Sequence, residues 1–245
     1  MRKITPPKLA PARKTRILVA DDHPLFREGL LQLISLESNY CCCGQADTVA
    51  ATRKAAATLK PDLLILDLRL RDGDGLELIK FLTGQDPRLP ILVLSQLDET
   101  LYAERALRAG ARGYVMKEEA STEVHLAIRA ILAGELYVSR KMSLIALHKL
   151  LSNESEPRSG YVERLSDREL QVFQMIGAGM ATSDIAGELK LSFKTIEAHR
   201  ENIKHKLGLR NAIDLLCHAT HWVHGLSTGI LHPPGSAPAP NRNRP

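Results

Sequence analysis

Five short apolar segments alternate with stretches of helical periodicity through the first 134 residues, and this alternation constrains the fold more than any other feature. The apolar segments have no polar side and are bounded by turn-forming residues, which is typical of strands buried on both faces of a parallel sheet. They cover residues 17–20, 40–43, 63–68, 91–94 and 113–116. The helical stretches cover residues 25–36, 48–59, 75–82, 99–109 and 121–132. Five such repeats predict a doubly wound α/β domain with a five-stranded parallel sheet over residues 16–134.

The chain changes character after this domain. Residues 135–151 predict one more helix, and the polar, pattern-free residues 152–160 predict a flexible linker, so that residues 135–164 form the connection. Residues 165–225 have only helical patterns and predict a small all-α domain of four helices. Ser166 followed by Glu169 forms a capping-box pattern at the start of the first of them.

The composition excludes several classes of protein. No apolar run reaches the ~18 residues that span a bilayer, which argues against a membrane protein. The basic residues 1–15 and the Pro-rich residues 226–245 predict disordered tails, and the first tail lacks the apolar core of a secretory signal. Three of the four cysteines are adjacent, at 41–43, which is neither a disulfide framework nor a zinc spacing. A soft apolar strand is favoured over the alternative, a redox sensor, because no lysine or histidine is adjacent in sequence. We therefore expect a cytoplasmic protein.

The net charge of +5 is unevenly distributed along the chain. It is +5 over residues 1–15, −4 over residues 16–135 and +4 over residues 136–245. An acidic first domain and a basic second domain indicate different partners, and the basic one suits a polyanion.

Acidic and polar residues stand where the predicted strands end. Asp21 and Asp22 follow the first strand, Asp67 lies at the end of the third, Ser95 follows the fourth and Lys117 follows the fifth. In an open parallel sheet, the carboxyl ends of the strands form the ligand site where the strand order reverses. Three carboxylates would repel one another there unless a cation lay among them, and an open site of oxygen ligands suits Mg²⁺. A lysine and a hydroxyl opposite would complete a site for a phosphoryl group.

These residues resemble the receiver domain of bacterial two-component response regulators, which has a flavodoxin-like fold. The resemblance rests on Asp-Asp-His-Pro at 21–24, Asp-Leu-Leu-Ile-Leu-Asp at 62–67, Leu-Ser at 94–95 and Gly-Ala-Arg-Gly-Tyr-Val-Met-Lys at 110–117. It implies that Asp67 is the phosphoacceptor, which takes a phosphoryl group from a sensor histidine kinase. It also implies that Mg²⁺ binds Asp22, Asp67 and the backbone carbonyl of Arg69 directly, and Asp21 through water.

The same resemblance implies a switch around the phosphoryl group. Ser95 and Lys117 would contact the phosphoryl oxygens, and the Tyr114 ring would turn inward as the Ser95 hydroxyl moves toward the phosphoryl group. The chain departs from the family at Arg71 and Glu118, where receivers commonly have proline. On this resemblance the chain is no enzyme beyond promoting its own phosphorylation and dephosphorylation at Asp67.

The second domain contains two helices that a tight turn separates, over residues 182–189 and 193–207. The second of these helices buries Ile196, Ile203 and Leu207 and leaves its other sides polar, which is typical of a helix-turn-helix that enters the major groove of DNA. His199 is predicted to pack between the buried residues. The candidates for contact with DNA are Lys194, Thr195, Glu197, Ala198, Arg200, Glu201 and Lys204.

This segment resembles the LuxR-type domain of regulators of the NarL/FixJ family. The resemblance implies that residues 193–207 are the recognition helix, with Lys194, Thr195 and Lys204 on phosphates and Glu197, Ala198, Arg200 and Glu201 at base edges. It also implies that the last helix, from residue 211, supplies a dimer contact. We therefore predict a transcription regulator that binds double-stranded DNA as a homodimer after phosphorylation at Asp67 releases or dimerises the second domain.

Three alternatives use parts of the same evidence. A DNA-binding module with a receiver that ignores phosphorylation would have no need of the acidic pocket. A phosphatase with an aspartyl intermediate would need an acid or base two residues after the nucleophile, where Arg69 stands. A ligand-sensing LuxR-type regulator shares only the second domain.

Overall fold

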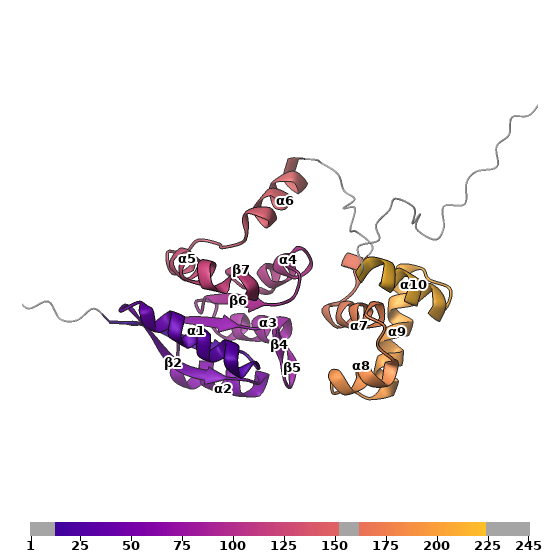
Figure 1. Cartoon of the computed structure of the whole chain (residues 1–245), viewed down its shortest axis with the longest axis horizontal. Helices are drawn as coiled ribbons and strands as arrows, with labels where there is room; N and C mark the ends of the chain where they lie inside the picture. The colour runs from indigo at the N-terminus through magenta and orange to yellow at the C-terminus, as the bar shows by residue number, and fades with distance from the viewer. Residues whose placement is uncertain (1–12, 152–161, 224–245) are drawn as a thin grey trace, which may run out of the picture. The chain divides into compact units, whose positions relative to one another are not determined.

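The computed structural model describes residues 13–151 and 162–223 of the chain (Figure 1). The chain divides into two compact units between Asn153 and Glu154, and each is described by itself. Outside these residues lie the linker predicted at 152–160, residues 1–12 of the first predicted tail and the whole of the second predicted tail. Within them, no helix is both long enough and apolar enough to cross a bilayer.

The first unit contains the predicted five-stranded parallel sheet with helices on both faces. Its strand order is β2-β1-β3-β6-β7. The strands are β1 (Thr15–Ala20), β2 (Tyr40–Ala46), β3 (Leu63–Leu66), β6 (Ile91–Ser95) and β7 (Gly113–Met116). The helices are α1 (Pro24–Leu36), α2 (Val49–Leu59), α3 (Gly75–Gln85), α4 (Glu99–Ala109) and α5 (Ala120–Leu132), and a short 3₁₀ turn (Lys117–Glu119) precedes α5. Helices α1 and α5 pack together on one face, and α2, α3 and α4 lie side by side on the other.

The core of this unit confirms the predicted burial of most of the apolar segments, but the edge strand β2 buries only Tyr40 and Ala46 and leaves Cys42 exposed. All four residues of β3 are buried on both faces of the sheet, as the central strand of such a fold requires. Side chains of α1 and α5, including Leu30, Ile34, Val124 and Ile128, form a single buried cluster with Leu63 and Ile65 of β3. The predicted fold class is therefore confirmed.

The loop after β3 is more regular than the sequence indicates. The strand ends at Leu66, two residues before the predicted end, and a small antiparallel hairpin follows, made of β4 (Arg69–Leu70) and β5 (Gly73–Asp74). Gly75 then begins α3 so close to Leu68 that an added Cβ would lie 2.5 Å from the Leu68 Cα. Only glycine fits there, because the obstructing atoms belong to the backbone.

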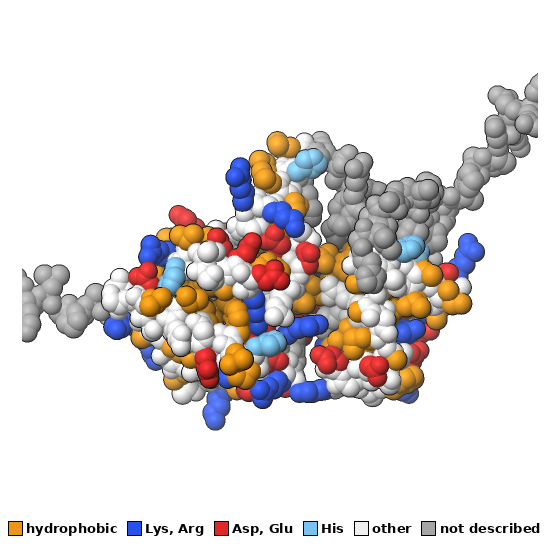
Figure 2. Space-filling model, viewed as in Figure 1, with side chains coloured by type: hydrophobic (Ala, Val, Ile, Leu, Met, Phe, Trp, Pro, Cys, Tyr) orange, Lys and Arg blue, Asp and Glu red, His pale blue; other side chains and the backbone are white. Residues whose placement is uncertain are grey.

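The helix predicted over residues 135–151 begins later than expected. The segment around Tyr137 instead runs along β7: the Tyr114 amide donates to the Tyr137 carbonyl at 2.9 Å, and the Tyr137 amide donates to the Arg112 carbonyl at 2.9 Å. Helix α6 (Arg140–Leu151) follows and extends away from the sheet, with apolar side chains gathered on its surface (Figures 1 and 2). This segment gives hydrogen-bond partners to the Tyr114 amide of β7 and to the Arg112 carbonyl just before the strand, which lie at the edge of the sheet.

The three adjacent cysteines lie in the edge strand β2, as predicted. Cys42 pairs with Ile17 and Gly44 with Leu18, so Cys43 is the extra residue of a bulge. Burial raises the pKa of the Cys42 and Cys43 thiols. Since the thiolate is the reactive form, this environment suppresses their reactivity.

The second unit is all-helical. Its elements are a 3₁₀ turn (Val162–Arg164) and helices α7 (Asp167–Gly177), α8 (Thr182–Glu188), α9 (Phe193–Leu207) and α10 (Ala212–Val223). The predicted capping box is present, with Ser166 and Glu169 each bonded to the backbone of the other. Ile196, Ile203 and Leu207 are buried, which confirms the predicted apolar side of α9.

Glu169 also joins α7 to α9. Its carboxylate is buried and accepts hydrogen bonds from the Ser166 amide at 2.7 Å and from the Lys206 ammonium at 2.6 Å. Burial by itself disfavours the charged form, but these donors outweigh it and hold the pKa of Glu169 below its usual value. A carboxylate with a lowered pKa stabilises the fold above its unfolded pKa, about 4.3, and loses this effect as the pH falls through the folded value.

Replacement of this carboxylate is expected to destabilise the second unit. At neutral pH, Glu169→Gln should lose about 1.5–3 kcal/mol, the contribution of hydrogen bonds to a charged group, and its stability should fall less than the parent's between pH 5 and pH 3. Trp222 is the only tryptophan of the chain, and the centre of its ring lies 5.7 Å from the centre of the Phe173 ring. Its fluorescence therefore reports the unfolding of this unit in urea. Glu201→Gln, which changes an exposed carboxylate of α9, is the control. Equal urea midpoints for the two variants would contradict the prediction.

Candidate functional site

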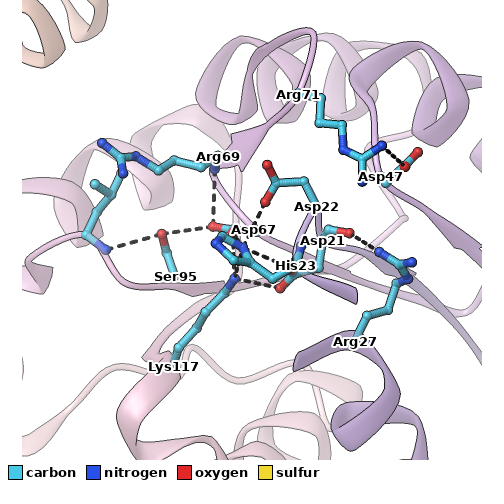
Figure 3. A network of polar contacts seen from close by, with 11 residues as sticks. Asp21, Asp22, His23, Arg27, Asp47, Asp67, Arg69, Arg71, Ser95 and Lys117 are labelled. Atoms are coloured by element: carbon cyan, nitrogen blue, oxygen red, sulfur yellow. Dashed lines mark hydrogen bonds and ion pairs between the residues drawn. The ribbon is translucent and has the colours of Figure 1, made fainter. Parts of the chain in front are cut away.

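The strand register brings the predicted site residues to one edge of the sheet. Ala20 at the end of β1 pairs with Leu66 at the end of β3, and Ser95 at the end of β6 pairs with Met116 in β7. The strand order reverses between β1 and β3, which is the topological switch point of this fold. The polar residues that reach this edge are Asp21, Asp22, Asp67, Ser95 and Lys117 (Figure 3).

Asp67 lies at the centre of the cluster and is 3% exposed. Its Oδ1 accepts a hydrogen bond from the Ser95 hydroxyl at 3.1 Å and another from the Arg69 amide at 3.1 Å. Its Oδ2 accepts one from the Lys117 ammonium at 2.6 Å. Burial raises the pKa of Asp67, while the charge of Lys117 acts in the opposite direction. These contacts fix the orientation of the Asp67 carboxylate.

Lys117 supplies the positive charge of the cluster. Its Nζ lies 2.7 Å from Asp21 Oδ2 and 2.6 Å from Asp67 Oδ2, and its side chain is 3% exposed. The ammonium also lies 4.7 Å from the centre of the Phe26 ring, a favourable cation–π distance. A cation in this position stabilises charge on the carboxylates and on any anionic group that approaches Asp67.

The remaining carboxylates form a donor set for a divalent cation. One oxygen each of Asp21, Asp22 and Asp67 and one nitrogen of His23 lie within 4.8 Å of one another. Asp22 Oδ1 is buried and accepts no hydrogen bond from the described residues, although His23 Nδ1 lies 2.8 Å away. A buried carboxylate oxygen left without a donor has the electron pair that a metal ion needs, so these residues fit a divalent metal.

The structure adds two contacts to the predicted site, one from His23 and one from the Arg69 amide. His23 received no role, although its place directly after Asp22 is a signal, because imidazole nitrogen is a common metal ligand. Arg69 reaches the site through its amide, on Asp67, and its carbonyl as a metal ligand stays a prediction.

The predicted switch residues lie next to this cluster. The Tyr114 ring is buried, and its hydroxyl donates to the Leu97 carbonyl at 2.6 Å. Burial raises the pKa of Tyr114, so its hydroxyl stays protonated. The Ser95 hydroxyl is directed at Asp67 and the Tyr114 ring is turned inward, and their role as a switch stays a prediction.

The second unit presents a helix-turn-helix. Residues 189–192 connect α8 to α9, and the Ser192 hydroxyl accepts the Thr195 amide at 3.1 Å, which starts α9. His199 is half-buried, and burial lowers its pKa, in line with a packing role.

The predicted DNA contacts divide into two groups on α9. Lys194, Ala198 and Glu201 are exposed, whereas Thr195, Glu197, Arg200 and Lys204 are half-buried. Glu197 accepts a hydrogen bond from the Thr182 hydroxyl of α8 at 3.1 Å and lies 3.4 Å from the Arg200 guanidinium. Lys204 pairs with Glu201 at 2.7 Å. Arg200 and Lys204 therefore each have an acidic neighbour one turn earlier on the same helix.

Comparison with known proteins agrees with both units. Residues 17–129 match the response regulator receiver domain, and residues 163–219 match the luxR family of bacterial regulatory proteins. The chain is 32% identical over 209 residues to the oxygen regulatory protein NreC of Staphylococcus aureus, which covers 83% of this chain and 96% of that protein.

Solved structures give the same result. A structure of the RcsB response regulator of Salmonella typhimurium is 26% identical, with a TM-score of 0.62 over 86% of this chain and 98% of that one. RcsB of Salmonella enterica serovar Typhimurium, bound to a promoter in the presence of the phosphomimetic BeF₃⁻, is 27% identical, with a TM-score of 0.59 over 85% and 99%. With a receiver-type sheet, an acidic cluster at its switch point and a LuxR-type helical unit, the chain belongs to the NarL/FixJ family of two-component response regulators.

Proposed function

We propose that this regulator switches its DNA binding through phosphorylation of Asp67. The single observation that carries the proposal is the setting of the Asp67 carboxylate, which is buried, hydrogen-bonded to Ser95 and Arg69, and in contact with the Lys117 ammonium. We assign residues 16–134 to the receiver domain and residues 165–225 to the DNA-binding domain, joined by residues 135–164.

The proposed reaction transfers a phosphoryl group from a phosphohistidine of a sensor histidine kinase. A carboxylate oxygen of Asp67 forms the new bond to phosphorus, the bond from phosphorus to the imidazole nitrogen breaks, and the electron pair leaves with the histidine. Lys117 stabilises charge on the transferred group, and the Ser95 hydroxyl donates to one of its oxygens. The same groups would support slow hydrolysis of the acyl phosphate. The chain would thus promote only its own phosphorylation and dephosphorylation at Asp67.

We propose Mg²⁺ as the cation of this site. Asp22, Asp67 and the Arg69 carbonyl would hold it directly, and Asp21 would hold it through water. When bound, it supplies positive charge that offsets the charge of the phosphoryl oxygens. The buried Asp22 oxygen without a hydrogen-bond donor supports this assignment.

The proposed output is regulation of transcription from double-stranded DNA. A helix-turn-helix dimer reads two half-sites, and α10 would supply its dimer contact. The structure of RcsB on promoter DNA with BeF₃⁻ supports this reading for a relative. Such a regulator acts in the cytoplasm, where both the kinase domain and the DNA are present.

The proposal is tested with the full-length chain and acetyl phosphate. Intact-mass spectrometry should show the gain of one phosphoryl group when Mg²⁺ is present, and tandem mass spectrometry should place it on Asp67. A chain that gains none with Mg²⁺, or gains it at another residue, contradicts the proposal.

The residues of α9 should separate into two kinds of DNA contact. Lys194→Ala removes an exposed charge at the start of the helix, so it should weaken binding to all sequences alike and reduce the salt slope by about 1. Arg200→Ala should cost about 1–3 kcal/mol on the preferred site and relax the preference at one base pair. Fluorescence anisotropy on selected and scrambled DNA over a range of salt measures both effects.

The control for these variants is Lys80→Ala, which removes one charge from α3 of the receiver. It should leave affinity and salt slope as in the parent. If Lys194→Ala matches this control, or Arg200→Ala weakens all sequences equally, the assignment of contacts is wrong.

A further inference from the structure

The hairpin that follows the phosphoacceptor is fastened to the N-terminus of α2. The Asp72 carboxylate at the hairpin tip accepts hydrogen bonds from the Val49 amide and, at 3.1 Å, from the Ala50 amide. The Thr48 hydroxyl accepts the next amide, of Ala51, at 3.1 Å. Asp72 thus satisfies two amides that a helix leaves without partners in its first turn, from a position 22 residues or more away in the chain.

Two further contacts strengthen this attachment. The Arg71 guanidinium lies 3.0 Å from the Asp47 carboxylate (Figure 3), and the Arg71 amide approaches the Asp47 carbonyl at 3.5 Å. Gly73 packs closely on Val49, since an added Cβ would lie 3.0 Å from its Cγ2 atom. The loop after the acceptor is therefore held by polar contacts to residues 47–50.

The same part of the chain supports the other acidic loop of the site. The Asp21 amide donates to the Ala46 carbonyl at 3.0 Å. The Arg27 guanidinium donates to the Asp21 carbonyl at 2.6 Å and to the Gln45 side chain at 3.1 Å. Residues 45–50 therefore support both the loop that carries Asp21 and Asp22 and the hairpin that follows Asp67.

The hairpin connects this attachment at Asp72 to the phosphoacceptor Asp67. Arg69 pairs with Asp74 and Leu70 with Gly73, so fixing the tip at Asp72 fixes both short strands. The Arg69 amide in turn holds Asp67 Oδ1 at 3.1 Å. Arg69 reaches the site through its backbone, and its own side chain is exposed. This side chain therefore does not anchor the backbone in the way that a buried side chain would.

From this arrangement we infer that Asp72 is a positioning residue for phosphorylation, which holds the Arg69 backbone against Asp67 and the cation. The inference rests on the proposed function of Asp67 and Mg²⁺. Asp72 itself touches neither, so its removal should act on the affinity for the cation more than on the maximum rate. Loss of a partner that orients a metal ligand commonly costs 10- to 100-fold in affinity.

The test compares Asp72→Ala, Asp72→Asn and the parent in full-length chains. Calorimetry with Mg²⁺ should give a dissociation constant at least about 10-fold higher for Asp72→Ala, with Asp72→Asn between it and the parent, because one amide oxygen can still accept one of the two bonds. With acetyl phosphate, the half-saturating Mg²⁺ concentration should rise by the same factor, while the maximum rate changes less than about threefold.

The matched control is Asp86→Ala. Asp86 is also an exposed aspartate that accepts a backbone amide, that of Arg88 at 3.0 Å, but it lies at the other end of α3. If Asp72→Ala folds poorly, the test uses Asp72→Asn alone. The expected result is then a rise of about threefold in the dissociation constant for Mg²⁺.

The outcomes separate the two claims. If the parent binds Mg²⁺ and is phosphorylated, and the Asp72 variants match Asp86→Ala in both constants, the positioning role is wrong while the proposed function stands. A loss confined to the maximum rate also overturns it. If the parent neither binds Mg²⁺ nor takes up a phosphoryl group, the proposed function fails and this inference fails with it.

Discussion

Asp67→Asn is expected to take up no phosphoryl group from acetyl phosphate at any Mg²⁺ concentration. The amide that replaces the carboxylate lacks the nucleophilic oxygen, so the rate of transfer should fall by at least about 10³-fold. The fold should survive, because the amide oxygen can still accept from the Ser95 hydroxyl and the Arg69 amide, and Lys117 keeps its ion pair with Asp21. Intact-mass spectrometry after incubation with the donor measures the loss.

The control for this variant is Asp86→Asn, an equally conservative change at an exposed position. It should be phosphorylated at the parental rate. Uptake by Asp67→Asn at a rate within tenfold of the parent would show that another residue accepts the group.

Lys117→Met is expected to destabilise the receiver by about 3–5 kcal/mol in the absence of divalent cations. Lys117 is buried between Asp21 and Asp67, and removing one partner of a buried ion pair leaves uncompensated charge behind. Methionine keeps approximately the volume of the side chain but loses the ammonium charge, including its cation–π contact with Phe26, so the loss reports the charge and not a cavity. Hydrogen exchange of the β3 amides in the full-length chain gives the free energy of opening for this unit alone.

A cation should partly reverse this loss. Mg²⁺ binds the folded pocket, and its charge replaces that of the missing ammonium. Saturating Mg²⁺ should therefore raise the free energy of opening of the variant more than that of the parent. Lys80→Met, an exposed change in α3, should alter exchange by less than about 0.5 kcal/mol with or without Mg²⁺. Equal protection of Lys117→Met and Lys80→Met without Mg²⁺ would contradict the role assigned to Lys117.

Much of the receiver is predictable because its signals are local and periodic. Each buried strand is a short apolar run, and parallel register then places the residue after each run at the same edge, which brings Asp21 and Asp67 together. The helical unit is predictable for the same reason, since Ile196, Ile203 and Leu207 recur on one side of α9.

The features that sequence patterns miss depend on pairing between distant segments. Tyr137 leaves the expected helix because β7 offers an open edge, and Asp72 finds its partners at Val49 and Ala50. Glu197 has the polarity of a base contact, yet its nearest donor is the Thr182 hydroxyl on α8. Such contacts follow from the packed structure, where a polar side chain bonds to whichever group lies within reach.

Phosphorylation at Asp67 is expected to control DNA binding, and a single set of titrations can show whether it does. A DNA site selected by the chain from a random pool is titrated with the parent and with Asp67→Asn, each with and without acetyl phosphate and Mg²⁺, by fluorescence anisotropy. We expect at least about fivefold tighter binding by the phosphorylated parent, the lower end of typical coupling between sites, and no change for Asp67→Asn. Equal affinity of both proteins under all conditions would contradict it.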